Sequence, residues 1–548
     1  MGKTDQSTLT PAEEQAGARI REASEEDVEQ IRDVYLAVYG QDYPHPQFYD
    51  LYQLKKLVFS DETILVVAED LQTGQILGTA AVLLDIGAHA DLVGEFGRLA
   101  VHPDARRRGI GRLLMQHRLE RVQDRLHLGL VDNRVSHAFS QKICAAQQFR
   151  PVGFLPLKMR LAGRESVVMF ARHFGEALSL RRNNPRIIPE AYELANHALS
   201  ACGLNRDAIA DEEAPSYPQD ESFELDELST EGYSTLLRLQ RGRVRHREIF
   251  GPLRLHYGMF KLMATHSNYL LARQHGVIVG AIGFTIDEVE RAVRVFELIS
   301  ANEQPEHFLV DQLLKKCQSQ WKIEYVEVDV SAYAPRMQRT LIELKFLPAA
   351  YIPAMVFHEV ERLDALRMVR LLVPFPSTSP AVIDAAKPIA DGVAQSFVSQ
   401  AVEPRIADAA AAAVGLFHGL TDEQAGRLAS ICRIETFAAG QDILVEGQLD
   451  DKTFLMLQGE ASVCVSDCSR PVVSIGAGEF LGEMALLRQV PHSATVTAQT
   501  RTEVAVLRRD QLNALMRQRP DIGLVLYRNL AVGIGQKLSG TDHASDGV

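Results

Sequence analysis

The sequence has few cysteines, no long apolar run and no excess of positive charge, and each shortage excludes a class of protein. The six cysteines include no Cys-x-x-Cys pair, so neither a disulfide framework nor a zinc site is indicated, and we expect no metal. No apolar run approaches the ~20 residues of a membrane helix. The net charge of −13 argues against broad binding to nucleic acid or to anionic membranes.

The start of the chain also lacks a targeting signal. Residues 1–14 are polar and contain no apolar stretch of the signal-peptide kind. Gln6 stands where a myristoylation motif needs serine or threonine. We therefore expect a cytoplasmic protein with a disordered leader over residues 1–18. A chain of 548 residues is too long for one core, so several domains are expected.

A basic glycine loop is the most informative stretch of the chain. It follows a predicted strand that ends at a proline turn at residues 102–104, and it precedes a predicted helix with apolar positions Leu113, Leu114 and Leu119. The loop reads Arg106-Arg107-Arg108-Gly109-Ile110-Gly111. Glycines let backbone N–H groups approach a phosphate, a helix N-terminus favours negative charge, and arginines are planar charged donors. The loop has neither the Gly-Lys-Ser/Thr of a P-loop nor the third glycine of a dinucleotide fingerprint. It predicts a cradle for a pyrophosphate; the alternative is a solvated basic turn.

Arg106, Gly109 and Gly111 match an Arg-x-x-Gly-x-Gly signature, and here the chain resembles the GCN5-related N-acetyltransferase (GNAT) family. Residues 97–103 are similar to that family's fourth strand and its turn. The order of predicted elements over residues 19–159 is also that of the family's fold. The resemblance implies acetyl-CoA, or another acyl-CoA, as cofactor. It places the pantetheine arm against the backbone of Leu99, Ala100 and Val101, and the pyrophosphate on the loop formed by Arg106, Arg107, Arg108, Gly109, Ile110, Gly111 and Arg112.

The resemblance also suggests catalytic residues, and here the sequence departs from the family. Many members carry a tyrosine that protonates the leaving thiolate, but the matching position is Cys144. A thiol, with a reference pKa near ~8.5, could donate a proton, although a small buried cysteine is the alternative reading. His137 and Ser140 lie earlier on the same predicted helix face and are other candidates for the proton donor.

Glu95 is the candidate general base, because the family often places a carboxylate on this strand. Strict alternation would put Glu95 on one face with Gly97, Leu99 and Val101. The alternative is a strand carboxylate that faces solvent. Residues 39–46, which contain Tyr39, Tyr43 and His45, resemble the acceptor-side loop, although ordinary packing would also explain their aromatic content.

Residues 221–365 repeat the order of predicted strands and helices of the first domain but lack the basic glycine loop. At the position of the basic glycine loop, residues 301–307 read Ala-Asn-Glu-Gln-Pro-Glu-His. Glutamate side chains therefore stand where a pyrophosphate would need hydrogen-bond donors. The segment resembles a second, degenerate GNAT domain that has lost its cradle. Its expected role is to form one wall of the acceptor site or to hold the domains together.

The C-terminal region has a third pattern, with short predicted strands punctuated by Gly440, Gly447, Gly459, Gly476 and Gly478. This spacing is typical of a β-barrel or jelly roll. Residues 478–496 resemble the phosphate-binding cassette of cyclic-nucleotide-binding domains. The resemblance implies cAMP or cGMP as an effector, bound by Gly482, Glu483, Met484, Ala485, His492 and Ser493. His492 replaces an arginine of the family, and histidine is neither permanently charged nor bidentate. Weakened phosphate binding is therefore expected; the alternative is a structural or protein-binding relic.

Together these patterns predict a multidomain α+β protein. The expected parts are a catalytic GNAT domain with a mixed sheet flanked by helices (19–165), a connecting segment (166–220), a degenerate GNAT-like domain (221–365), a linker (366–414) and a β-jelly-roll domain (415–540). We interpret the chain as a bacterial N-acyltransferase that acts on an amine, either protein lysine or a small molecule, under allosteric control by the C-terminal domain. The rival hypothesis is a sensor or scaffold that binds CoA or nucleotide without turnover. No nucleic-acid or membrane partner is expected, and the oligomeric state stays open, a homodimer included.

Overall fold

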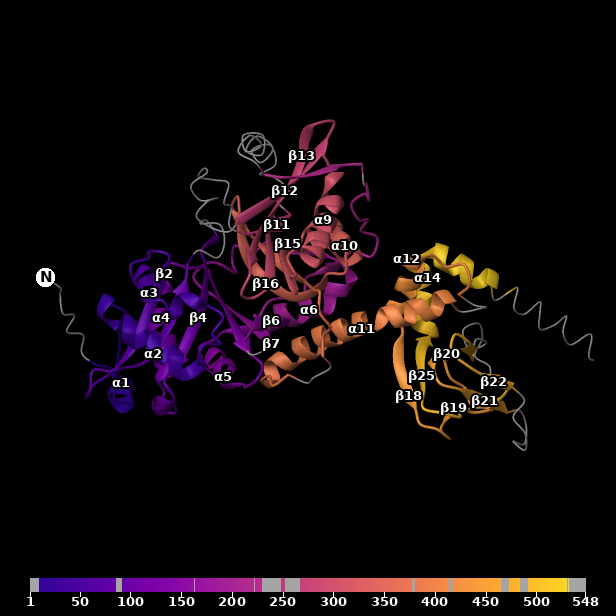
Figure 1. The fold of residues 1–548 in the computed structure, drawn as a ribbon, viewed down its shortest axis with the longest axis horizontal. Coiled ribbons are helices and arrows are strands. Elements are labelled where there is room, and N and C mark those ends of the chain that lie inside the picture. The colour runs from indigo at the N-terminus through magenta and orange to yellow at the C-terminus, as the bar shows by residue number, and fades with distance from the viewer. Residues whose placement is uncertain are drawn as a thin grey trace, which may run out of the picture. The chain divides into compact units, whose positions relative to one another are not determined.

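The computed structural model describes residues 9–84, 91–161, 163–220, 222–228, 248–251, 267–376, 380–412, 417–464, 473–482, 491–529 and 531. The chain divides into two compact units, residues 1–395 and 396–548. Figure 1 shows the elements of both units. Within the described ranges, no helix is long and apolar enough to cross a membrane, and no group of three or more His, Cys, Asp or Glu residues is arranged to hold a metal.

A single sheet runs through the first unit, with fifteen strands among its described residues. Its first seven strands lie in the order β1-β2-β3-β4-β5-β7-β6. Their bounds are β1 (Ala18–Glu22), β2 (Thr63–Asp70), β3 (Ile76–Leu83), β4 (Val93–Val101), β5 (Leu128–Arg134), β6 (Arg150–Arg160) and β7 (Arg164–His173). All neighbours are antiparallel except β4 and β5, which are parallel.

The second half of the same sheet repeats this arrangement in mirror order, β16-β17-β15-β14-β13-β12-β10. Its strands are β10 (Glu224–Glu227), β12 (Ser267–Gln274), β13 (Val277–Asp287), β14 (Ala292–Ser300), β15 (Tyr325–Ser331), β16 (Leu347–His358) and β17 (Glu361–Leu371), and β11 (Ile249–Phe250) pairs with β15. Again one neighbouring pair is parallel, β14 with β15. The two halves therefore share one strand topology.

Helices cover both faces of the first half. Helices α2 (Val28–Tyr39) and α3 (Leu51–Val58) bury an apolar stripe against β2 to β4, including Ala81 and Ala100. Helix α4 (Ile110–Val122) packs on the opposite face, where Ile110 and Leu114 lie against Gly78. Further helices among the described residues of this unit are α1 (Pro11–Ala16), α5 (Phe139–Ala146), α6 (Pro189–Ala201), α9 (Pro305–Ser319) and α10 (Pro335–Glu343). Two short strands, β8 (Arg186–Ile187) and β9 (Ile209–Ala210), pair with each other.

The two halves join where β6 meets β16, at the pair Gly153 and Ala350. A side chain at Gly153 would sit 2.1 Å from Ala350 Cβ and 2.6 Å from its Cα, so only glycine lets the strands approach. Two arginines also tie the halves together. Arg362 donates to the carbonyl of Asp91 at 2.8 Å, and Arg164 donates to the carbonyl of Arg291 at 3.2 Å. Each half therefore contributes an arginine that holds a backbone segment of the other.

Several predicted boundaries need correction. The leader is partly ordered, because α1 forms with a capping box at Thr10, while residues 1–8 lie outside the described part of the chain. The boundary at 165 falls inside β7 and the boundary at 365 falls inside β17; both strands are inner strands of the sheet. Much of the predicted linker 366–414 is one helix, α11 (Lys387–Ala412).

Where the structure describes it, the second unit contains two four-stranded antiparallel sheets, in the orders β18-β25-β20-β23 and β19-β24-β21-β22. These strands are β18 (Arg433–Phe437), β19 (Asp442–Leu444), β20 (Lys452–Gln458), β21 (Ala461–Cys464), β22 (Val473–Ile475), β23 (Phe480–Leu481), β24 (Thr495–Ala498) and β25 (Thr502–Arg508). Helices α12 (Asp422–Ser430) and α14 (Arg509–Gln518) flank them. A cluster that includes Phe454, Met456 and Val504 fills the space between the sheets. This is the β-sheet architecture that the glycine spacing predicted.

The junction between the halves yields a stability prediction. Replacing Gly153 with alanine places a methyl group inside the contact with Ala350, so we expect the free energy of unfolding to fall by about 1–3 kcal/mol. Gly163→Ala is the matched control, because its new methyl group meets no atom within 4 Å. Urea denaturation of the full chain measures both. Equal stability of the two variants would contradict the proposed role of this junction.

Candidate functional site

Strands β4 and β5 separate partway along β4. They pair over Val93 to Glu95 only, although β4 continues to Val101. On its other edge, β4 stays paired with β3, but the register shifts so that Gly97 faces Ala81 and Ala100 faces Thr79. One extra residue is thus accommodated, and Arg98 adopts a φ of +59°. The result is a bulge beside an opening in the sheet.

Two buried side chains hold this bulge. The Tyr35 hydroxyl donates to the Arg98 carbonyl at 2.7 Å. Arg118 donates to the carbonyls of Gly97 at 3.1 Å and Ala81 at 2.8 Å. Arg118 is 1% exposed, and burial lowers its pKa to about 10, so it stays cationic at neutral pH. Sequence reasoning missed Tyr35 and Arg118, because their partners are backbone carbonyls of a distant strand.

The basic glycine loop lies where β4 leads into α4. Gly109 caps α4 with a φ of +83°, a conformation that glycine adopts without steric cost. The first N–H groups of a helix have no partner within the helix. Arg106, Arg107 and Arg112 are exposed, and within the described residues none of the three forms an ion pair or hydrogen bond through its side chain. These three guanidinium groups and the end of α4 are available to an anion.

Arg108 differs from its neighbours and corrects the predicted anion-binding set. Its guanidinium donates to the Ala16 carbonyl at 2.8 and 3.0 Å and to Asp70 at 3.1 Å. The side chain is therefore committed to joining the loop to α1 and β2. The sequence did not reveal this use, because Ala16 lies 92 positions away.

Glu95 lines a cavity beside the bulge, and its Oε1 lies 3.5 Å from Arg98 Nη1. The expectation that Glu95, Gly97, Leu99 and Val101 share one face is wrong. Because of the register shift, Glu95 and Gly97 point to the same face of the sheet as Ala100. Leu99 and Val101 point to the opposite face. Glu95 nevertheless faces the side on which α2 packs, and it lines the cavity together with Tyr39, Tyr43 and His45.

Cys144 and Ser140 line the same cavity from α5, with His137 at its edge. Cys144 is 1% exposed, and the Asn133 amide donates to its sulfur at 3.4 Å. Burial raises the pKa of this thiol to about 11. His137 is exposed and precedes the first residue of α5, so it does not share a helix face with Cys144 as the sequence suggested.

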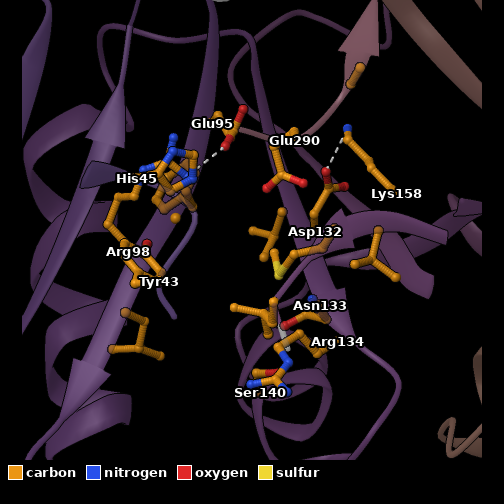
Figure 2. Close-up of a pocket in the computed structure, with 18 of the residues that line it drawn as sticks. Tyr43, His45, Glu95, Arg98, Asp132, Asn133, Arg134, Ser140, Lys158 and Glu290 are labelled. Atoms are coloured by element: carbon orange, nitrogen blue, oxygen red, sulfur yellow. Dashed lines mark hydrogen bonds and ion pairs between the residues drawn. The ribbon is translucent and has the colours of Figure 1, made fainter. Parts of the chain in front are cut away.

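The cavity has a volume of about 400 Å³ and is lined by both halves of the sheet. Tyr39, Tyr43 and His45 form its aromatic side, and Tyr39 and Tyr43 stack at 4.7 Å. Burial holds the pKa of His45 well below its ordinary value, so this ring is neutral at pH 7. The second half contributes acidic and basic groups, among them Glu290, Arg294 and Glu327. Figure 2 shows Glu95, Asp132 and Glu290 around the cavity.

The corresponding opening in the second half is occupied by the chain itself. Strands β14 and β15 pair over Ala292 to Val295, and β11 then pairs with β15 through Ile249 and Phe250. The next residue, Gly251, packs so tightly on β14 that a Cβ there would lie 2.6 Å from Phe296 Cα. The two halves thus share a topology but differ at this position: β11 fills the second opening.

The second unit carries the predicted nucleotide cassette. Gly482 has a φ of +71°, and its carbonyl accepts from the Thr453 hydroxyl at 3.0 Å. The His492 ring is nearly buried, with Nε2 3.0 Å from Asp450 Oδ1. Ser493 is described but forms no hydrogen bond through its side chain within the described residues. Glu483, Met484 and Ala485 lie outside the described part of the chain.

Comparison with known families now assigns two of these regions. Residues 28–145, which contain β4, the loop and α5, match the Acetyltransferase (GNAT) family. The chain contains a GNAT acetyltransferase domain. Residues 434–519 match the cyclic nucleotide-binding domain family. The chain therefore combines a GNAT domain with a C-terminal cyclic nucleotide-binding domain, as the two sequence resemblances predicted.

Curated relatives cover only part of this architecture. A cGMP-dependent protein kinase of Plasmodium berghei is 31% identical over 117 residues, which are 21% of this chain and 13% of the kinase. A cAMP-dependent protein kinase regulatory subunit of Aspergillus fumigatus is 35% identical over 109 residues, 20% of this chain and 26% of the subunit. Among solved structures, a cyclic nucleotide-binding domain from Methylobacillus flagellatus has 25% identity and a TM-score of 0.24, covering 26% of this chain and 81% of its own. This chain therefore spans well under a third of those curated relatives.

The separate role of Arg108 can be tested by stability. Arg108→Ala removes several hydrogen bonds to Ala16, Gly17 and Asp70, so we expect the free energy of unfolding to fall by about 1 kcal/mol. Arg107→Ala removes the same charge from an exposed side chain and is expected to change stability by less than about 0.5 kcal/mol. Thermal or urea unfolding compares them. A larger loss for Arg107→Ala would contradict the assignment.

Proposed function

We propose that the chain is an N-acyltransferase whose first half transfers an acetyl or other acyl group from acyl-CoA to an amine. The single observation that carries this proposal is the opening between β4 and β5 after Glu95, next to the glycine-capped start of α4. The backbone of Leu99 to Val101 would pair with the pantetheine arm there. The pyrophosphate would lie at the end of α4, among Arg106, Arg107 and Arg112, because these exposed guanidinium groups are not engaged in ion pairs with other described residues.

Chemistry at this site requires a base and an acid. Glu95 is half-exposed and in the cavity, so it can accept a proton from an incoming amine directly or through water. Cys144 lies near buried Arg118, whose positive charge would stabilise a thiolate in this part of the cavity. We assign the protonation of the departing CoA thiolate to this region, with Cys144 as donor and His137 as the alternative.

We further propose that the second half derives from the same fold and has no CoA site of its own. Its strand order and single parallel pair support the common origin. The insertion of β11 beside β15 supports the loss of the site, because a pantetheine arm would need that space. Its role would be to complete the acceptor cavity of the first half.

The C-terminal domain would regulate transfer by binding a cyclic nucleotide. Because His492, which lies 3.0 Å from Asp450, stands where a phosphate-binding arginine is expected, we propose that affinity for cAMP or cGMP is low. The rival function is a sensor that binds CoA or nucleotide without turnover, and the buried, hydrogen-bonded Cys144 is the observation that favours it. Release of free CoA from acetyl-CoA in the presence of an amine separates the two hypotheses.

The CoA site itself is tested by charge reversal. Arg106→Glu should weaken acetyl-CoA binding by at least about tenfold, because it replaces an attraction for the pyrophosphate with repulsion. Arg125→Glu is the matched control: it makes the same charge change beyond the other end of α4, on an exposed side chain. Isothermal titration calorimetry of the full chain measures both. Unchanged affinity in folded Arg106→Glu would refute the site.

The nucleotide site is tested by restoring the arginine. His492→Arg should strengthen binding of cAMP or cGMP to the full chain by tenfold or more, since a hydrogen bond to a charged group contributes about 1.5–3 kcal/mol. His418→Arg adds the same charge to an exposed position of the same unit and should change nothing. Isothermal titration calorimetry with each nucleotide measures the affinity of both variants. No heat from either nucleotide with His492→Arg would end the regulatory proposal.

A further inference from the structure

The turn between β13 and β14 belongs to the second half, yet it lines the cavity of the first. Asp287 ends β13, Ala292 begins β14, and the cavity lining includes Asp287, Glu290 and Ala292. Figure 2 shows the Glu290 carboxyl group directed into the cavity along with those of Glu95 and Asp132. A carboxylate separated by 195 positions from Glu95 is thereby placed in the same chamber.

The first half holds this turn firmly. The Arg160 backbone N–H donates to Glu290 Oε2 at 2.6 Å, and the Arg160 guanidinium donates to the Val289 carbonyl at 3.0 Å. Arg164 donates to the carbonyls of Glu290 and Arg291, and its Nε lies 2.6 Å from Glu324. Glu324 in turn binds Arg291 at 2.8 Å. Because backbone atoms carry most of these contacts, the position of the Glu290 side chain is set by the joint between the halves.

Three other carboxylates of the cavity lie near cations, and the fourth, Asp287, is exposed and accepts the Glu290 backbone N–H at 2.9 Å. Asp132 pairs with Lys158 at 2.8 Å, and Glu95 lies 3.5 Å from Arg98. Glu327 is close to Lys158 at 3.5 Å and Arg294 at 3.7 Å. Glu290 differs from them: among the described residues, no lysine, arginine or histidine side chain forms an ion pair with it. The Glu290 carboxylate therefore has no cationic partner among the described residues, and a bound ammonium group can supply one.

We propose that Glu290 of the second half, in place of Glu95 beside Arg98, receives the acceptor ammonium group and takes its proton in the acyltransfer carried out by the first half. This inference rests on the proposed function. It identifies the substrate class as a cation, a primary ammonium on a side chain or a small amine. It also gives the second half a direct part in the chemistry.

The carboxylate of Glu290 takes one proton from R–NH₃⁺, and the neutral nitrogen attacks the thioester carbonyl carbon. A C–N bond forms and the C–S bond breaks. The second N–H proton leaves the nitrogen as the CoA thiolate is protonated, which gives the amide and free CoA. Glu290 returns its proton to solvent, so one proton is released per turnover.

Burial supports this role, because it raises the pKa of Glu290 to about 7. The charged groups that act on it are Asp287 on its own strand pair, Lys158 on β6 and Arg164 on β7. The cavity lining adds Glu95, Arg98, Asp132, Arg294 and Glu327. A base with this pKa is ionised just above neutrality yet returns its proton readily. Since the folded pKa exceeds the ordinary value, stability falls as the pH rises from the ordinary value to about 7, and the ionised carboxyl group destabilises the fold above that. Its replacement by glutamine should therefore not weaken the fold at pH 7.

The test compares Glu290→Gln with Glu288→Gln in the full chain. Glu288 is exposed on the same turn, so its variant controls for loss of one negative charge. The probes are spermidine and N-α-acetyl-lysine methyl ester with acetyl-CoA, and free CoA is measured by chromatography from pH 5.5 to 9. For the wild type we expect a rate that rises up to about pH 7 and then levels off. Glu290→Gln should lower that rate at least about 100-fold and abolish the rise, and Glu290→Asp should recover part of it.

Calorimetry with acetyl-CoA separates this inference from the proposed function. Glu290→Gln should bind acetyl-CoA within about twofold of the wild type, because the residue lies on the acceptor side. A wild-type rate and pH profile in Glu290→Gln would overturn the inference and leave acyl transfer standing. Release of no CoA by the wild type with either amine would overturn both.

Discussion

The site depends on the point at which β4 leaves β5. Parallel pairing stops after Glu95, and the extra residue at Arg98 turns the strand so that its outer edge faces an opening. A strand edge of this kind exposes backbone donors and acceptors that an extended ligand can pair with. The bulge is stable because Tyr35 and Arg118 satisfy the Arg98 and Gly97 carbonyls from two different helices. A ligand-binding edge is thus built from main-chain geometry and supported by buried side chains.

The second half supports this site through a joint with approximate two-fold character. Arg164 of the first half holds the β13–β14 turn, and Arg362 of the second half holds Asp91 at the start of the first half's β4 segment. Each arginine also contacts a side chain of the other half, Glu324 for Arg164 and His127 for Arg362. One continuous sheet then fixes the cavity walls relative to each other. The second half, whose own opening is filled by β11, therefore contributes lining residues to the cavity of the first half.

The sequence predicted those parts of the site that depend on neighbouring residues. The glycine–arginine loop, the start of α4 and the glycine-punctuated strands of the C-terminal unit carry local signals, and all are found. The parts that depend on distant pairing were missed. Nothing near Arg98 marks a bulge, and one extra residue reverses the side of every residue after it. The side chain of Arg108 binds Ala16, and Glu290 enters a cavity of the other half, so no local pattern could assign either one.

Hydrogen–deuterium exchange of the full chain, with and without CoA, tests whether the open edge of β4 binds the coenzyme. We predict that CoA slows exchange of the backbone amides over residues 97–101 and 106–112. We also predict no change along β14, where β11 already fills the corresponding place. Protection along β14, or none along β4, would contradict the account.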